Sequence, residues 1–86
     1  MNEETYYRAK FDPTLCASGV IDAFDLGFNL GNVIKYVLRA GRKKNAGIPD
    51  DADKNALFDL KKASDYLTHQ IEIIEHRIAE KQRLSE

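Results

Sequence analysis

The sequence predicts an all-α fold in which two short helices pack on one long C-terminal helix and the domain assembles as a helical homo-oligomer. Two apolar patterns with helical spacing support this prediction, one over residues 30–38 and one over residues 57–78. No stretch shows the strict alternation of apolar and polar residues that predicts a strand. A chain of 86 residues can bury only a limited core, and small chains often gain stability by oligomerising.

The expected elements follow from local signals along the chain. Pro13 after Asp12 favours a helix start, and Gly27 can stop that helix. Asn29 can cap the second helix with its side chain, and Gly41 can end it in the left-handed conformation. The predicted bounds are an N-terminal polar and aromatic arm at 1–12 and a single helical domain at 13–86, with helices at about 13–24, 29–41 and 51–83.

The third predicted helix carries a regular heptad seam. Its members alternate in steps of three and four, with one polar residue among them: Leu57, Leu60, Ser64, Leu67, Ile71, Ile74 and Ile78. This spacing is typical of a helix that packs lengthwise on another helix. The first half of the heptad seam can pack on the shorter helices. The second half outruns them, so residues 71–78 are expected to meet another subunit.

Composition excludes several classes of function. The net charge of −1 argues against a general coat for long nucleic acid or for a membrane surface. Cys16 is the only cysteine, so neither an intramolecular disulfide nor a thiolate metal cluster can form within one chain. His69 and His76 have no acid or cysteine at ligand spacing, and no nucleophile–base pair is apparent. We therefore expect no metal, no cofactor and no catalytic residue. Without a signal peptide pattern or a membrane-length apolar run, a cytoplasmic location is expected.

Residues 27–44, GFNLGNVIKYVLRAGRKK, combine glycines and asparagines at a helix start with cations farther along. Asn32, Lys35 and Arg39 fall at i, i+3 and i+7, so they form a column on one helix face. No acidic residue occurs over residues 26–49. A helix start offers free N–H groups and a favourable dipole, which with these cations suit a phosphate group. The column continues into the loop with three more cations: Arg42, Lys43 and Lys44.

Gly31 and Tyr36 complete this candidate phosphate site. Gly31 lets a ligand or another helix approach the backbone closely, and Tyr36 lies on the flank of the column. The same pattern also fits the solvated face of an ordinary helix, and Gly31 can equally serve tight helix packing. Spacing alone leaves both interpretations open.

A second polar column, formed by Asp59, Lys62 and Tyr66, lies on the third predicted helix at i, i+3 and i+7. If it faces the first column, Asp59 can pair with Lys35 or Arg39, or accept a hydrogen bond from a sugar hydroxyl or a base. Ordinary surface ion pairs are the alternative interpretation of this column.

The N-terminal arm offers aromatic residues. Tyr6 and Tyr7, with Arg8, can stack on a nucleobase. They can equally pack over the core of the domain.

Two segments together resemble a small bacteriophage family, domain of unknown function 3310. They are FNLGNVIKYVLRAGRK (28–43) and DLKKASDYL (59–67), with VIDAFDLG (20–27) as the lead-in. The family is similar to part of a phage-encoded nucleoside monophosphate kinase that lacks a P-loop. Its pattern singles out residues that largely coincide with the two columns, with Leu60 as an exception that is expected in the core. They are Asn29, Gly31, Asn32, Lys35, Tyr36, Arg39, Gly41, Arg42, Lys43, Asp59, Leu60, Lys62 and Tyr66.

Three functions are carried forward from the sequence. The first is a phage-type binding protein in the host cytoplasm that holds a phosphorylated nucleotide. By analogy with other small helical phage proteins, its purpose would be to sequester a nucleotide signal of host immunity as an anti-defence device. The second is the nucleoside monophosphate kinase that the resemblance implies, although Asp59 is the only clear carboxylate beside the cations. The third is a structural helical oligomer whose basic face binds a partner protein. The first is preferred, and on that view the protein is not an enzyme.

Overall fold

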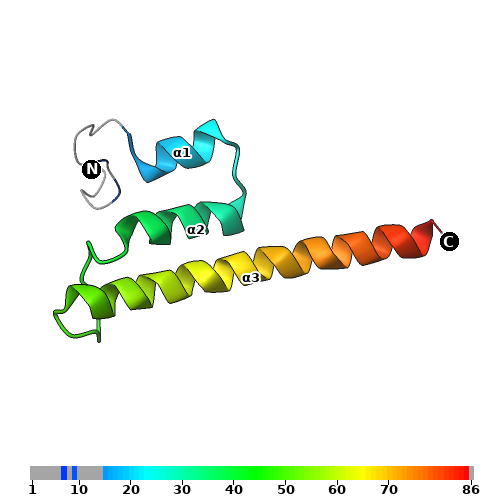
Figure 1. The fold of residues 1–86 in the computed structure, drawn as a ribbon. Coiled ribbons are helices and arrows are strands. Elements are labelled where there is room, and N and C mark those ends of the chain that lie inside the picture. The colour runs from blue at the N-terminus through cyan, green and yellow to red at the C-terminus, as the bar shows by residue number, and fades with distance from the viewer. Residues whose placement is uncertain (1–6, 8, 10–14, 86) are drawn as a thin grey trace.

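The computed structural model describes Tyr7, Ala9 and residues 15–85. Within this part of the chain the elements are three helices and no strand, which confirms the predicted all-α class. The three helices are α1 (Ala17–Ala23), α2 (Phe28–Arg39) and α3 (Ala52–Leu84), shown in Figure 1.

Helix α3 begins and ends within one residue of the sequence prediction. Asp51 is its N-cap, and the Asp51 side chain accepts a hydrogen bond from the Lys54 backbone N–H at 3.0 Å. Asp53 lies in the first turn, with Lys81 and Arg83 in the last. These charges complement the helix dipole at both ends, which is why the boundaries could be predicted locally.

Helix α2 starts earlier than predicted and uses a different N-cap. Gly27 is the N-cap, and it makes no side-chain cap hydrogen bond. Asn29 does not cap the helix, because its side chain is buried and donates to Gln70 Oε1 at 3.0 Å. The predicted end is confirmed: Gly41 follows the C-cap Ala40 with φ +77°, the left-handed region that glycine favours.

Helix α1 is shorter than the predicted 13–24. Leu15 and Cys16 precede it in non-helical conformation, and Cys16 is the N-cap. It ends before Gly27 is reached, because Asp25 already adopts a positive φ of 53°. The proposed start at Pro13 lies outside the described residues.

The three helices are arranged with α2 in the middle (Figure 1). Helix α2 runs antiparallel to α3 along its first half, and α1 packs on the side of α2 away from α3. The second half of α3 projects beyond the other two helices (Figure 1). The predicted packing of two short helices on a long one is therefore seen, with α2 making most of the contact with α3.

The side chains that α2 and α3 bury between them are mainly polar. Among the described residues the buried polar or charged residues are Asn29, Arg39, Asn45, Asn55 and Asp59, whereas the buried hydrophobic residues are only Ala17 and Ala63. The leucines and isoleucines of the heptad seam are 41–54% exposed along its whole length. The expectation that the first half of the heptad seam packs on the shorter helices was therefore wrong. The Arg39–Asp59 pair and its neighbours occupy that face of α3 instead.

None of the described helices combines the length and the apolar character that crossing a membrane requires.

Candidate functional site

A hollow of about 310 Å³ lies at the N-terminus of α2, on the side where α1 packs. Its volume falls at the lower end of the range of small-molecule sites. Both helices and the turn between them contribute to its wall: Ile21, Leu26, Gly27, Phe28, Gly31, Asn32 and Lys35. We call it the α2 hollow.

The start of α2, where Gly27 and Phe28 line the α2 hollow, has backbone donors that no helical hydrogen bond uses. The first helical hydrogen bond runs from Gly31 N–H to Gly27 O at 2.8 Å. The N–H groups of residues 28–30 come before that bond, so they have no acceptor within the helix. The positive end of the helix dipole lies at the same place. This end of α2 therefore favours an anion.

Gly31 brings α1 close to α2 beside the hollow. A Cβ atom at Gly31 would lie 3.4 Å from Ile21 Cγ2, so even alanine would be tight here. The sequence offered two interpretations of Gly31, close helix packing and close approach of a ligand. In the structure Gly31 packs closely against α1 and also lines the α2 hollow.

Lys35 is the cation of the α2 hollow. The Lys35 Nζ atom lies 5.6 Å from the Tyr36 ring centroid and 6.0 Å from that of Tyr7, within cation–π distance of both. Lys35 also lines a second hollow of about 180 Å³ with Tyr7 and Ser18. These contacts hold the ammonium group between two rings. Asn32, one turn earlier, donates to Phe28 O at 2.9 Å and so braces the first turn of α2.

Aromatic rings connect the α2 hollow to α3. Tyr36 stacks on Tyr66 with centroids 5.9 Å apart, and Phe28 meets Tyr66 edge-on at 5.7 Å. These ring contacts place Tyr36, on the flank of the first predicted column, against Tyr66 of the second, whereas Asn32 and Lys35 line the α2 hollow on the side of α1. Lys62 projects from α3, where its Nζ lies 5.8 Å from the Phe58 ring centroid.

Arg39 and Asp59 form a buried ion pair at the other end of the α2–α3 contact. Arg39 Nε donates to Asp59 Oδ1 at 3.0 Å, which confirms one of the two pairings proposed for Asp59. Arg39 Nη1 donates to the Tyr7 hydroxyl at 3.2 Å, and Nη2 donates to Asn45 Oδ1 at 2.7 Å. Each nitrogen of the guanidinium group thus has a protein acceptor. In this structure Arg39 holds the fold together and does not line the α2 hollow.

The charge state of Arg39 is secured by these partners. Burial on its own would lower the pKa of Arg39, but the hydrogen bonds that Arg39 donates to Tyr7 and Asp59 and the charge of Asp59 outweigh it, so the pKa is raised. Asp59 is fully buried, and its Oδ2 has no hydrogen-bond partner among the described residues. The carboxylate therefore depends on Arg39 and on Asn45 Nδ2, which lies 3.3 Å from Oδ1.

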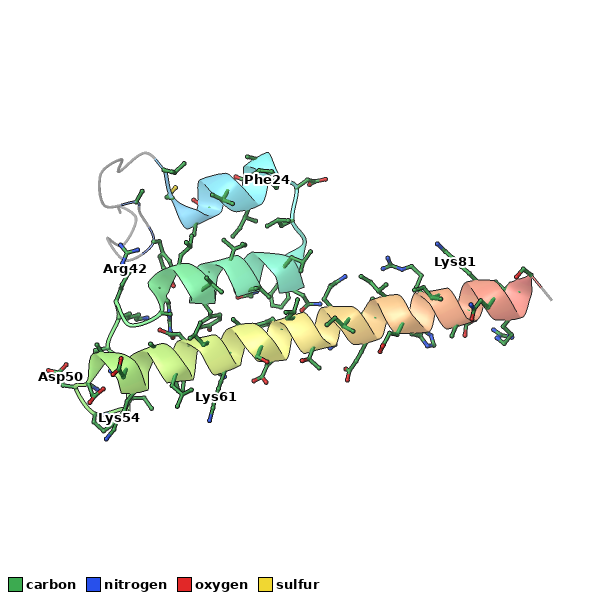
Figure 2. The ribbon with its side chains drawn as sticks, in the orientation of Figure 1. Phe24, Arg42, Asp50, Lys54, Lys61 and Lys81 are labelled. Carbon is green, nitrogen blue, oxygen red and sulfur yellow. The ribbon has the colours of Figure 1, made fainter. Side chains whose placement is uncertain are left out.

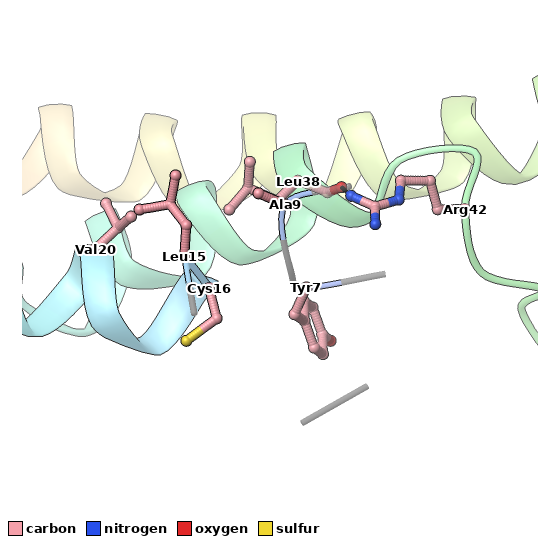
Figure 3. A pocket seen from close by; sticks show the side chains of 7 residues that line it. All are labelled: Tyr7, Ala9, Leu15, Cys16, Val20, Leu38 and Arg42. Atoms are coloured by element: carbon pink, nitrogen blue, oxygen red, sulfur yellow. Dashed lines mark hydrogen bonds between the residues drawn. The ribbon is translucent and has the colours of Figure 1, made fainter. Parts of the chain in front are cut away.

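The loop cations lie apart from the α2 hollow. Arg42, Lys43 and Lys44 line a shallow hollow of about 190 Å³ with Asp50 at the start of α3. Arg42 also borders a hollow of about 150 Å³ between α1 and α2, where Figure 3 shows its side chain beside Leu38. The other side chains around that hollow are mainly apolar, and Tyr7 closes one side of it.

The structure divides the predicted site residues into groups. Gly31, Asn32 and Lys35 come together in the α2 hollow, whereas Arg42 and Lys43 stay in the loop. Those between α2 and α3, or packed on that contact, are Asn29, Tyr36, Arg39, Asp59, Tyr66 and Tyr7. Lys62 is exposed on α3, and Tyr6 lies outside the described residues. Whether any of them binds a ligand stays a prediction.

Sequence reasoning missed Phe28, which lines the α2 hollow and is 74% exposed. An exposed ring at a helix start, beside Gly27 and off the apolar stripe of the helix, is the signal that could have identified it. Its position depends on the helix starting at residue 28 and not at Asn29.

The fold and the site define a class: a small all-α protein built on an antiparallel helix pair, with a cationic hollow at a helix N-terminus. Comparison with known proteins places it further. Residues 20–68 match the family described as protein of unknown function DUF3310, and the chain belongs to that family. No curated protein and no solved structure matches the chain.

Proposed function

We propose that this chain is a small nucleotide-binding protein that holds a phosphorylated nucleotide in the α2 hollow. One observation carries the proposal. Gly27 and Phe28 at the start of α2, the cationic residue Lys35 and the 74% exposed Phe28 side chain all line one hollow of about 310 Å³. Phosphate and a flat apolar base are the two chemistries that this combination can recognise together.

Each part of the α2 hollow has a separate role in the proposed complex. The phosphate lies against the N–H groups of residues 28–30 and accepts from Lys35 Nζ. The base stacks on the Phe28 ring. No proton transfer or bond cleavage is needed for this role.

The biological setting in this proposal comes from the resemblance to bacteriophage proteins. A phage product of this kind would act in the host cytoplasm, as a homo-oligomer, and would sequester a nucleotide signal of host immunity. The kinase alternative is less favoured by the geometry. Arg39 is tied to Asp59 inside the fold, so it is not positioned to stabilise a transferred phosphoryl group.

Replacing Lys35 with alanine is expected to weaken nucleotide binding by about ten- to a hundredfold, because one charge-assisted hydrogen bond to phosphate is lost. Isothermal titration calorimetry with nucleoside monophosphates and with inorganic phosphate measures this loss. Lys54→Ala is the matched control, since Lys54 is exposed at the start of α3, far from the hollow (Figure 2). Equal affinities for the two variants would contradict the site.

Phe28→Ala separates base recognition from phosphate recognition. We expect it to weaken binding of a nucleotide by roughly 5- to 100-fold through lost stacking, with no change for inorganic phosphate. Phe24→Ala is a close control, because Phe24 is also 74% exposed and does not line the α2 hollow. If both variants bind the nucleotide equally, Phe28 does not hold the base.

Native mass spectrometry of the protein from phage-infected cells then identifies the ligand. An unaltered nucleotide at one or fewer per subunit supports sequestration. A protein that comes out empty, and that converts a monophosphate and ATP into a diphosphate, is a kinase and contradicts the proposal.

A further inference from the structure

We infer that the heptad seam of α3 pairs antiparallel with the heptad seam of a second copy of this chain. The inference deepens the homo-oligomer proposed above and is independent of nucleotide binding. Its first support is exposure: the leucines and isoleucines of the heptad seam are 41–54% exposed over the length of α3. An apolar row this regular, along a helix of 33 residues, is the contact surface of a helical assembly.

The apolar stripe of α2 extends this surface. Helix α3 meets α2 through the face that carries Asp59 and Ala63. Each residue turns the helix by about 100°, so the heptad seam lies roughly a quarter-turn around the α3 axis from that face, rotating in the sense in which residue numbers increase. Leu30, Val33 and Val37 lie at roughly the same offset from Tyr36, which meets α3. Each apolar row is thus rotated by a similar angle, in the same sense, from the face of its helix that meets the other helix. Because α2 and α3 are antiparallel, this rotation places the apolar row of α2 and the heptad seam of α3 on the same side of the helix pair. The α2–α3 pair therefore presents one broad apolar face.

The length of α3 indicates what covers that face. The contact between α2 and α3 extends from Asp59 to Gln70 of α3. Arg39 of α2 pairs with Asp59 at one end, and Asn29 of α2 donates to Gln70 at the other. Beyond this point α3 continues to Leu84, and no other helix of the described residues lies beside it (Figure 1). In an antiparallel dimer, the free second half of α3 of each copy packs on the apolar face of the α2–α3 pair of the other copy. A parallel copy would leave the α2 stripe uncovered.

Charge along the edges of the heptad seam favours the same orientation. With the two-fold axis near residue 69, Leu67 lies opposite Ile71 of the second copy, and Lys61 lies opposite its Glu75. Figure 2 shows Lys61 on the side of α3 away from α2, where it can flank the contact. The symmetry makes this opposite-charge pair twice. In a parallel pairing the corresponding flanking neighbours include Gln70 with Glu75, and no opposite charges meet.

The antiparallel contact leaves the α2 hollow open. Gly31 and Lys35 lie on the face of α2 that meets α1 or borders it, away from Leu30, Val33 and Val37. Assembly and ligand binding therefore use different faces of α2, and each can be tested without the other.

A charge-swap series tests the pairing. Lys61→Glu and Glu75→Lys should each raise the dimer dissociation constant roughly tenfold, because each brings like charges together twice. The double variant should restore the wild-type value. Glu72→Lys is the control, since Glu72 lies off the heptad seam and should change the constant little. Sedimentation velocity or native mass spectrometry gives the constants, and assemblies of several dimers count as support.

A distance measurement fixes the orientation. In a Cys16→Ser background, a spin label at Gln82→Cys should report an intersubunit distance of about 40 Å for the antiparallel pair. A parallel pair would bring the two labels to roughly 10–15 Å. A short distance, a monomer at the highest soluble concentration, or a double variant that is not rescued would overturn the inference. Titrating the Lys61 and Glu75 variants with inorganic phosphate tests the proposed function separately from the dimer. Phosphate binding that is unchanged in a variant that no longer dimerises concerns the pairing alone.

Discussion

Arg39→Ala is expected to lower the free energy of unfolding by about 3–5 kcal/mol, because removing one partner of a buried ion pair leaves the other charge uncompensated. The remaining charge would be Asp59, which is fully buried and already has one oxygen without a partner among the described residues. Asn45 and Tyr7 would lose their guanidinium donors as well. Urea unfolding at a fixed protein concentration measures the loss.

Arg83→Ala is the matched control for this prediction. Arg83 pairs with Glu80 near the end of α3, but both side chains are exposed, at 68% and 41%. An exposed pair of this kind contributes about 0–1 kcal/mol. If Arg83→Ala costs as much as Arg39→Ala, the burial of the Arg39–Asp59 pair is not what makes it matter.

A second variant covers the case in which Arg39→Ala does not fold. Replacing the pair together by apolar residues, as in Arg39→Met with Asp59→Leu, removes both charges and should recover much of the lost stability. Failure of that double variant to fold would show that the hydrogen bonds around the pair matter more than the unpaired charge.

Asn55→Ala is expected to cost about 3 kcal/mol, since it leaves several buried polar groups unsatisfied. Asn55 Oδ1 accepts from the Asn45 backbone N–H at 2.7 Å, and Asn55 Nδ2 donates to the carbonyl oxygens of Pro49 and Asp51 at 3.0 and 2.9 Å. One buried side chain thus ties the loop between α2 and α3 to the first turn of α3. The loss should appear in urea unfolding and as faster amide hydrogen exchange over residues 45–51.

Gln82→Ala provides the comparison for Asn55. Gln82 is an exposed amide on the same helix, so its replacement should change stability by no more than about 0.5 kcal/mol. Unchanged exchange at Asn45 in the Asn55→Ala variant would show that the loop does not depend on this amide. A domain of this size is expected to have a total stability near the lower end of about 5–15 kcal/mol, so either buried change removes a large share of it.

The helices were predictable because their signals are local. The end of α2 at Gly41 and the start of α3 at Asp51 follow from single residues with strong conformational or capping preferences. The start of α2 was mistaken, since Asn29 looks like a cap in sequence. Its side chain instead reaches Gln70, a residue that the sequence does not show to be near.

The candidate site was predictable only in part. Helical spacing placed Asn32 and Lys35 on one side of α2, and both line the α2 hollow. The same spacing put Arg39 with them, yet Arg39 turns to α3 and pairs with Asp59. Its position lies between the two faces of α2, so a long side chain can reach either. Which partner it meets depends on the packing of α3.

By itself, the sequence determined the helical class, the order of the helices, the ends of α3 and the presence of two polar columns, because each depends on residues within a few turns of one another. Only the tertiary structure decided that α2 and α3 meet through Arg39–Asp59 and Tyr36–Tyr66, and that the heptad seam points outward. Periodicity shows that a helix has an apolar face, but not what covers it. Here a buried charge must be paired wherever it lies, so the polar faces of α2 and α3 meet, and the apolar rows are left on the surface.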